Sequence, residues 1–364
     1  MITKKMVENV SEETIAFITT GGTIGAALGD GVVTLENDIG AAKLRQFVTD
    51  FVEKNGLDLR VFSSLNKFSE DFEPADWGAI FEQIDECLKS GIKRVVIAHG
   101  TDTLAYSAFA TSLYYNDSGA RICFTAAFTP PSDAGSDAFL NIEGALEAVQ
   151  TDALHPGVYV AFRKNFFEVA VYRAQDLKPI AFDHTQFDSV YGRTAARYTY
   201  DSIAGTAVPG GIVEITNIAA PNMSGNEPHP SVRDLKTLKC RVIQIPAYPG
   251  MDLATLNLEA GKENLIILES FHSGTIPAVA LRSQIRDLSK RAPKTLVVSA
   301  PHPYRYIKNP YETTAALERD GFIRVYRDLL PYQLYTLAVC ETAKGESLKN
   351  ALARAEPWRF RRFE

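Results

Sequence analysis

Short apolar segments rich in β-branched residues recur along this chain, and each stops at glycine, proline or a cluster of polar residues. They cover residues 15–20, 94–98, 122–125, 158–162, 242–245, 265–268 and 295–299. Apolar runs of this length between such breakers are typical of strands buried on both faces of a parallel sheet. Neighbouring parallel strands need a crossover connection, which is usually a helix. The pattern therefore restricts the chain to folds in which strands and helices alternate.

Helical patterns fill several of the intervals between these segments. In residues 76–88, Ile80, Ile84 and Leu88 recur four residues apart and so fall on one face of a helix. Residues 104–115, 144–154 and 278–290 show similar patterns. We therefore predict an α/β fold built on parallel sheets.

The stretch from about residue 206 to 238 breaks this alternation. It contains Pro209-Gly210-Gly211 and then a polar, proline-rich run over 221–230. Connections of this length are usually functional loops or linkers, and 364 residues are enough for two domains. We predict an N-terminal α/β domain over 1–205 that carries the active site, a linker over 206–237, and a smaller C-terminal α/β domain over 238–364.

Composition narrows the class of partner. The 38 Lys and Arg residues against 44 Asp and Glu residues give a formal charge of −6, which argues against nucleic acid or an anionic membrane as the main partner. The four cysteines are far apart and form no Cys-x-x-Cys pair, so the sequence indicates neither a disulfide framework nor a zinc site. The N-terminus has no apolar core of a secretory signal. We expect a cytoplasmic protein that acts on a small molecule.

Three predicted strand ends carry dense groups of small polar residues. Thr19–Gly25 combines threonines with glycines, His99–Thr103 holds an imidazole, a carboxylate and two hydroxyls, and 66–71 contains Ser69. Ligands of open parallel sheets bind beyond the carboxyl ends of the strands. For any one segment, helix capping is the alternative explanation, because Ser, Thr and Asp are favoured N-cap residues. The glycine pattern is not that of a dinucleotide or triphosphate loop.

Taken together, these segments resemble the bacterial-type asparaginase family of amidohydrolases. Thr20–Ile24 reads Thr-Gly-Gly-Thr-Ile and His99–Thr103 reads His-Gly-Thr-Asp-Thr, which are that family's two signatures. Ser69 stands eight residues before Trp77, as the family's substrate-binding serine does before its helix. The resemblance implies an asparaginase-like fold with a flavodoxin-like N-terminal domain and a Rossmann-like C-terminal domain. It also implies the cytoplasmic type of enzyme, assembled as a homodimer or homotetramer.

Amide hydrolysis needs a nucleophile, a base that takes its proton, and hydrogen-bond donors for the oxyanion. The resemblance implies that Thr23 is the primary nucleophile and that Thr101 is the second threonine, next to a water molecule. It implies neither a cofactor nor a metal.

Four further residues take substrate-binding roles by the same resemblance. Asp102 would hold the α-amino group of an amino-acid-like substrate. Ser69 and Glu70 would hold its carboxylate and amino ends. Ala127, in a segment similar to the family's at 125–130, would offer its backbone carbonyl to the scissile amide.

The chain departs from the family pattern at two activating positions. Counting from both sides places the family's catalytic lysine at Arg173, and Lys178 lies five residues too late. A buried lysine can lose its proton and act as a base, whereas a guanidinium stays charged. The family's loop tyrosine would fall near Val32 or Val33, and the first tyrosine of this chain is Tyr106.

Two functions therefore stay open on the sequence. The chain could hydrolyse the side-chain amide of L-asparagine or a related compound, with Arg173 beside Thr101 and Asp102 as an anion clamp and electrostatic stabiliser. The alternative is a non-hydrolytic or weakly active amino-acid-binding homologue on the same scaffold. We expect His99 to hold its loop by hydrogen bonds and to take no chemical role.

Overall fold

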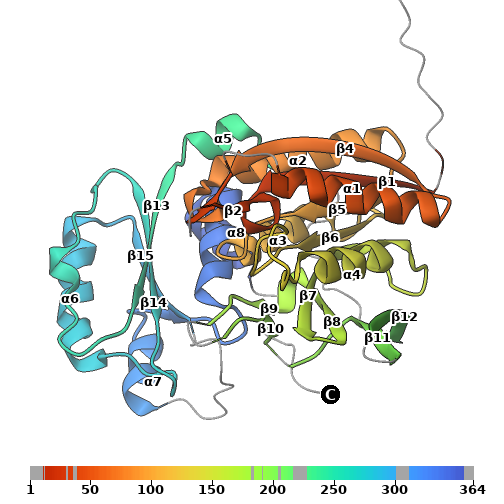
Figure 1. Ribbon diagram of the computed structural model, residues 1–364. Helices are drawn as coiled ribbons and strands as arrows, with labels where there is room; N and C mark the ends of the chain where they lie inside the picture. The colour runs from red at the N-terminus through yellow and green to blue at the C-terminus, as the bar shows by residue number, and fades with distance from the viewer. Residues whose placement is uncertain are drawn as a thin grey trace, which may run out of the picture. The chain divides into compact units, whose positions relative to one another are not determined.

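An eight-stranded sheet organises the N-terminal part of the molecule. The computed structural model describes Ser11 and residues 13–29, 32–35, 39–181, 184–190, 192–203, 206–215, 228–300 and 311–355. The chain divides into two units, Met1–Glu227 and Pro228–Glu364, each of which Figure 1 shows with its own sheet. The sheet of the first unit has the order β12-β11-β8-β7-β6-β5-β1-β4.

Two kinds of pairing make up this sheet. The parallel part consists of β4 (Asp58–Lys67), β1 (Thr14–Gly21), β5 (Arg94–Ala98), β6 (Arg121–Thr125) and β7 (Gly157–Asn165). The antiparallel part adds β8 (Glu168–Arg173), β11 (Ala196–Ile203) and β12 (Thr206–Ile215). In the parallel part, β1 lies between β4 and β5, which is the strand order of flavodoxin-like sheets. The order reverses at β1, and ligands of such sheets bind at that point.

Helices pack against both faces of the sheet because the central strands are apolar on both sides. Helices α1 (Ile39–Lys54) and α4 (Ala138–Gln150) share one core with alternate strand residues such as Ile15 and Phe17. Helices α2 (Pro74–Lys89) and α3 (Leu104–Tyr115) contact the sheet and each other (Figure 1). A small hairpin of β2 (Ala27–Gly29) and β3 (Val32–Thr34) follows β1.

The second unit is built on a four-stranded parallel sheet. Its order is β13 (Cys240–Pro246), β14 (Glu263–Glu269), β15 (Thr295–Ala300) and β16 (Arg324–Val325). Helices α6 (Ala278–Arg291) and α7 (Glu312–Arg319) form a core with one face of this sheet. Helix α8 (Pro331–Ala343) contacts β13, β14, α5 (Val232–Lys236) and α9 (Leu348–Ala353). The predicted α/β class with parallel sheets is confirmed in both units.

The first part of the expected linker is a strand. Residues 206–215 form β12, which pairs with β11 at the edge of the large sheet. Thr199 pairs with Gly211 and Tyr200 with Pro209, so Gly210 is bulged out of the ladder. Proline and glycine are tolerated at edge strands and bulges, and for that reason a composition typical of linkers occurs here in a strand. Residues 216–227 of the expected linker lie outside the described residues, and the domain boundaries at 205 and 238 stay predictions.

No helix in the described part of the chain is long and apolar enough to cross a membrane.

Candidate active site

The loop that carries Thr23 is fixed at the carboxyl edge of the sheet by its neighbours. Thr19 pairs with Ala98 of β5, and Gly21 pairs with Lys67 of β4. The Thr20 hydroxyl donates to the Ala98 carbonyl at 3.0 Å, and the Gly22 N–H donates to the Lys67 carbonyl at 3.1 Å. The chain therefore enters the Thr23 turn already held between the ends of β4 and β5.

Two adjacent glycines allow this close approach. Gly21 and Gly22 have φ angles of +100° and +74°, which favour glycine. A Cβ atom on Gly21 would lie 2.5 Å from the Lys67 carbonyl oxygen, and one on Gly22 would lie 2.6 Å from the Gly100 Cα. The Gly-Gly pair of the first signature thus brings the Thr23 loop into backbone contact with the His99–Thr103 loop.

The Ser69 loop packs against the same place. Ser69 is 2% exposed, and its backbone carbonyl accepts a hydrogen bond from the Thr103 hydroxyl at 2.7 Å. A Cβ atom on Gly100 would lie 2.4 Å from the Ser69 Oγ. Because Gly100 has no side chain, the Ser69 hydroxyl can occupy this space. Gly100 directly precedes Thr101 in the chain.

The structure thus brings most of the predicted site residues to one edge of the sheet. Thr23 and Thr101 are half-buried, whereas Glu70 and Asp102 are exposed. These residues, with Ser69, follow β1, β4 and β5, and these three strands meet where the strand order reverses. Their hydroxyl and carboxylate groups therefore belong to loops at the edge where ligands of such sheets bind.

A fourth loop after β6 carries Ala127, which is buried. The Asp137 carboxylate accepts from the N–H groups of Phe128 and Thr129 at 3.0 and 2.9 Å. Asn141 donates through Nδ2 to the Ala126 carbonyl at 2.8 Å. These bonds fix the backbone on both sides of Ala127, the residue whose carbonyl the resemblance assigns to the scissile amide.

His99 holds its loop, as expected. Its Nδ1 lies 2.8 Å from the Gly100 carbonyl oxygen, and its backbone N–H donates to the Thr125 carbonyl at 2.8 Å. The ring is fully buried beside Phe72, with ring centroids 4.5 Å apart. Burial lowers the pKa of His99 to about 4, although the Gly100 bond and the charge of Asp76 oppose this shift. The imidazole is therefore neutral at neutral pH.

The sequence did not predict an ion pair that joins the end of β4 to α2. Lys67 Nζ lies 2.6 Å from Asp76 Oδ2, and both side chains are mostly buried. Asp76 also accepts from the Glu73 N–H at 2.7 Å at the start of α2. The sequence feature that could have indicated it is Asp76, which stands two residues after Pro74 in a pattern typical of a helix start. The pair ties the end of β4, and through it the Thr23 turn, to α2.

Arg173 is not part of this group, and its predicted place beside Thr101 and Asp102 is corrected. Arg173 ends β8 and pairs with Tyr159, which aligns with Cys123 in the middle of β6. The candidate loops follow the carboxyl ends of the strands, whereas β8 runs antiparallel to β7 and ends toward the opposite edge.

Two further observations support this correction. Arg173 follows Val171 by two residues and Val169 by four, so the three residues share one face of β8. The two valines belong to the core under α4. Arg173 also lines a cavity with Asn116, the residue after the C-terminal end of α3, whereas Thr101 and Asp102 precede its start. A helix of this length spans about 18 Å. Counting residues across the β7–β8 hairpin could not predict this register, because each step reverses the face of a side chain.

Metal ligands do not gather in the part of the chain that the structure describes. Within it, no group of three or more His, Cys, Asp or Glu residues could hold a metal ion. The four cysteines are free and buried.

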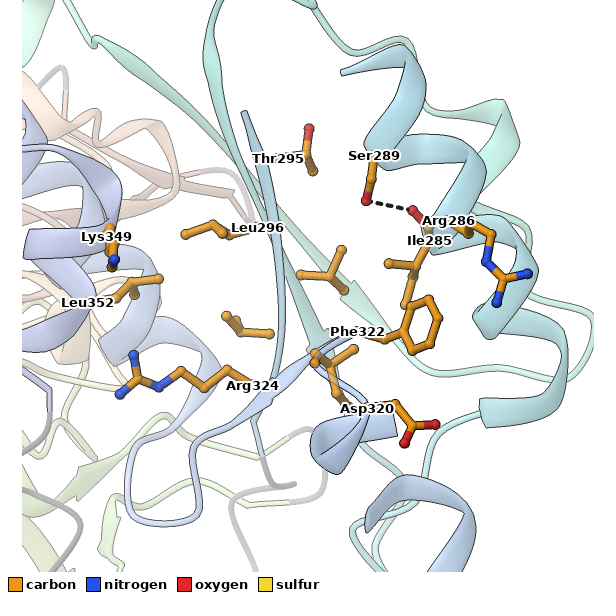
Figure 2. A pocket seen from close by; sticks show the side chains of 14 residues that line it. Ile285, Arg286, Ser289, Thr295, Leu296, Asp320, Phe322, Arg324, Lys349 and Leu352 are labelled. Carbon is orange, nitrogen blue, oxygen red and sulfur yellow. Dashed lines mark hydrogen bonds between the residues drawn. The ribbon is translucent and has the colours of Figure 1, made fainter. Parts of the chain in front are cut away.

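The second unit contains a cavity of about 510 Å³ at the edge of its sheet. Figure 2 shows Leu296 of β15, Phe322 and Arg324 around it, with Lys349 from α9. The Ser289 hydroxyl donates to the Ile285 carbonyl on its α6 side at 2.9 Å. None of the predicted site residues lies in this unit, so we assign the candidate site to the first unit.

A family model described as "Asparaginase, N-terminal" matches residues 14–203, which is slightly more than half of the chain and includes all the loops above. The chain belongs to the asparaginase family. The resemblance in its two signatures is thereby confirmed.

Curated relatives of this asparaginase-family chain include proteins named as a subunit of glutamyl-tRNA(Gln) amidotransferase. The one from Halobacterium salinarum is 28% identical over 197 residues, which cover 53% of this chain and 45% of the relative. The one from Pyrobaculum aerophilum is 39% identical over 80 residues, or 22% of this chain and 19% of the relative. The matched segments thus span less than half the length of these relatives.

Solved asparaginase structures share the whole fold. The L-asparaginase from Thermococcus kodakarensis has a TM-score of 0.71 and 22% identity, with 94% of this chain and 97% of that chain covered. L-asparaginase I from Vibrio cholerae has a TM-score of 0.71 and 22% identity, with 95% and 97% covered. At this identity the match shows the fold alone, and it extends over both units.

Proposed function

We propose that this asparaginase-family chain hydrolyses the side-chain amide of L-asparagine or a closely related amino-acid amide through Thr23. The observation that carries the proposal is the backbone contact of Gly22 with Gly100 and of Gly100 with Ser69. This packing supports the proposal because Thr23 directly follows Gly22 and Thr101 directly follows Gly100 in the chain. Membership of the asparaginase family supports the same chemistry.

In the proposed reaction, the Thr23 hydroxyl attacks the amide carbonyl carbon and loses its proton to a base. The tetrahedral intermediate collapses to a Thr23 ester, and the amide nitrogen leaves as ammonia after it takes up a proton. Water next to Thr101 then hydrolyses the ester and regenerates Thr23. Splitting the reaction into two easier steps is the general advantage of a covalent nucleophile.

Substrate binding follows from the charges around these hydroxyls. The exposed carboxylates of Asp102 and Glu70 suit the α-amino group of an amino acid, and the Ser69 hydroxyl suits its α-carboxylate. The Ala127 carbonyl suits the amide NH₂ group. No cofactor or metal enters the reaction, and Arg173 takes no part in it.

The competing function is amino-acid binding with little or no hydrolysis. It is favoured by the valines near 32–33, where the family's loop tyrosine would fall, because they leave Thr23 without one usual activating group. The same loops would then bind an amino acid without cleaving it.

Ammonia release from L-asparagine, L-glutamine and substituted amides separates the two functions. We expect turnover of at least one amide by the wild type, a fall of about 10³-fold in kcat for Thr23→Ala, and no change for Thr237→Ala, an exposed threonine in the second unit. If no amide is turned over while an amino acid still raises the melting temperature, the binding function replaces the enzymatic one.

We further propose a cytoplasmic homodimer or homotetramer that acts on a small substrate, without nucleic acid or membrane as partner. Light scattering coupled to gel filtration tests the assembly. A monomer that is fully active would contradict it.

A further inference from the structure

The cavity of the second unit lies where β15 has a neighbouring strand on one side only. β14 pairs with β15 from Thr295 to Ala300, whereas β16 pairs only with Val298 and Ser299. In the part of the chain that the structure describes, β16 is the last strand of this sheet. Residues 295–297 therefore form an open strand edge, and all three line the cavity of about 510 Å³.

The backbone of Val297 is directed at this open edge. The Ala300 carbonyl accepts from the Ser270 N–H after β14 at 2.9 Å, and the Ser299 carbonyl accepts from the Tyr326 N–H after β16 at 2.8 Å. Backbone groups alternate in direction along a strand, so the odd-numbered residues of β15 face the side of β16. The pairing with β16 begins only at Val298, and the Val297 N–H forms no hydrogen bond on that side with any described residue.

Residues from both faces of the sheet line this cavity. Val297 belongs to the same core as Ile285 of α6, and Leu296, the next residue along the strand, points to the other face. Figure 2 shows Ile285 and Phe322 on one side of β15 and Leu296 and Lys349 on the other. A cavity that reaches both faces has to pass the open edge of β15. It therefore occupies the place of a further strand.

Cations flank the open edge on both faces. Lys349 of α9 and Arg286 of α6 line the cavity and are exposed, and neither forms a hydrogen bond or an ion pair with the described residues. Arg286 packs over the Phe322 ring at 5.7 Å, a contact that leaves most of its five N–H donors for a ligand. Asp320, which also lines the cavity, is already paired with Arg282 at 2.6 Å. The cavity is therefore positively charged.

We propose that this edge is a docking site for an acidic peptide segment of another protein, which binds as an added strand beside residues 295–297. Main-chain hydrogen bonds give such strand addition its affinity, and the alternate side chains give it specificity. Successive side chains of an extended peptide point to opposite faces, so adjacent Asp or Glu residues meet Lys349 on one face and Arg286 on the other. Leu296, which is 39% exposed, offers an apolar contact to a flanking residue.

Fluorescence anisotropy on the full chain tests this site with the fluorescein-labelled peptide Ser-Val-Glu-Glu-Glu-Val-Ser. We expect saturable binding, and we expect Lys349→Glu and Arg286→Glu each to weaken it at least about fivefold. Both positions are exposed, so these variants should fold normally. The matched control is Arg291→Glu, an exposed position on the same helix α6 outside the cavity lining. It should change the affinity by less than about twofold.

Two further peptides separate strand addition from simple attraction between charges. The same peptide with Lys in place of Glu should not bind. A version with N-methyl groups on the three central residues lacks their N–H donors on both edges and should bind at least about fivefold more weakly. Absence of binding by the acidic peptide overturns the proposal, as does equal binding of the N-methylated or the lysine peptide.

A second copy of this chain is the alternative occupant of the open edge. If the acidic peptide does not bind and Arg286→Glu lowers the molar mass measured by light scattering, the edge is a self-association interface and the proposal is wrong. None of these measurements uses amide turnover, so failure here and failure of the proposed hydrolysis are observed separately.

Discussion

Gly100 lies against Ser69 so closely that a Cβ atom on the glycine would be 2.4 Å from the serine Oγ. A methyl group there has to displace a buried hydroxyl or move the loop that carries Thr101. We expect Gly100→Ala to destabilise the protein by about 1–3 kcal/mol and to lower kcat/KM by more than about tenfold. Urea unfolding and steady-state kinetics measure the two effects.

Gly261 is the matched control for this substitution. A Cβ atom on Gly261 meets nothing within 4 Å, and its φ is not in the left-handed region. Gly261→Ala should leave stability and kinetics unchanged, and a similar loss in both variants would show that the Ser69 contact is not the cause.

The ion pair of Lys67 and Asp76 should stabilise the fold around the candidate site. Asp76→Asn keeps the size of the side chain but leaves the Lys67 ammonium without its partner at 2.6 Å. We expect a loss of about 1–2 kcal/mol in the free energy of unfolding, together with faster amide hydrogen exchange at Gly22. Lys262→Met, which breaks an exposed pair with Glu259, should cost less than about 0.5 kcal/mol. Equal costs would contradict the structural role of the buried pair.

His99 should make the stability of the protein dependent on pH. Its pKa is about 4 in the folded chain, against an ordinary value of 6.5. Between these values the unfolded chain binds a proton that the folded chain does not, so stability is complete above about pH 6.5 and falls as the pH approaches 4. The loss from this residue is on the order of 3 kcal/mol.

Urea unfolding at neutral pH and at about pH 4 isolates this contribution. The fall in stability should be smaller in His99→Gln than in the wild type, and unchanged in His272→Gln, where the ring is exposed. An identical fall in all three proteins would show that His99 is not the titrating group.

Arg173→Lys should not create or raise asparaginase activity. The register of β7 and β8 places residue 173 beside Tyr159, at the far end of α3 from Thr101, and a lysine there cannot take a proton from the candidate nucleophile. Ammonia release from L-asparagine checks this expectation. A gain of tenfold or more would show that residue 173 reaches the candidate site after all.

The candidate loops could be predicted because their chemistry is local. Each follows an apolar run, and the parallel arrangement of these runs brings their carboxyl ends together. Gly21 and Gly22 were also readable as a turn, since glycine is the residue that positive φ requires. The two glycines contact Lys67 and Gly100, and these contacts depend on the order of the strands. The sequence indicated that order only through the resemblance of the two signatures to a known family.

The features that sequence reasoning missed are those that depend on register and partners. Arg173 was assigned by counting, and a hairpin register is not set by counting alone. Strand β12 was hidden because Pro209 and Gly210 are typical of linkers, and only its place at the sheet edge explains how they fit. The Lys67–Asp76 pair joins residues on different elements, and neither residue type indicates the other.

The contact between Gly22 and Gly100 also limits how this site can be redesigned. The two loops meet through main-chain atoms, so there is no side chain between them to trim when a larger substrate must be admitted. Every substitution of Gly22 or Gly100 adds side-chain volume at this contact. New space has to come from positions other than these two glycines, because a side chain on Gly22 would meet the Gly100 backbone and one on Gly100 would meet the Ser69 side chain.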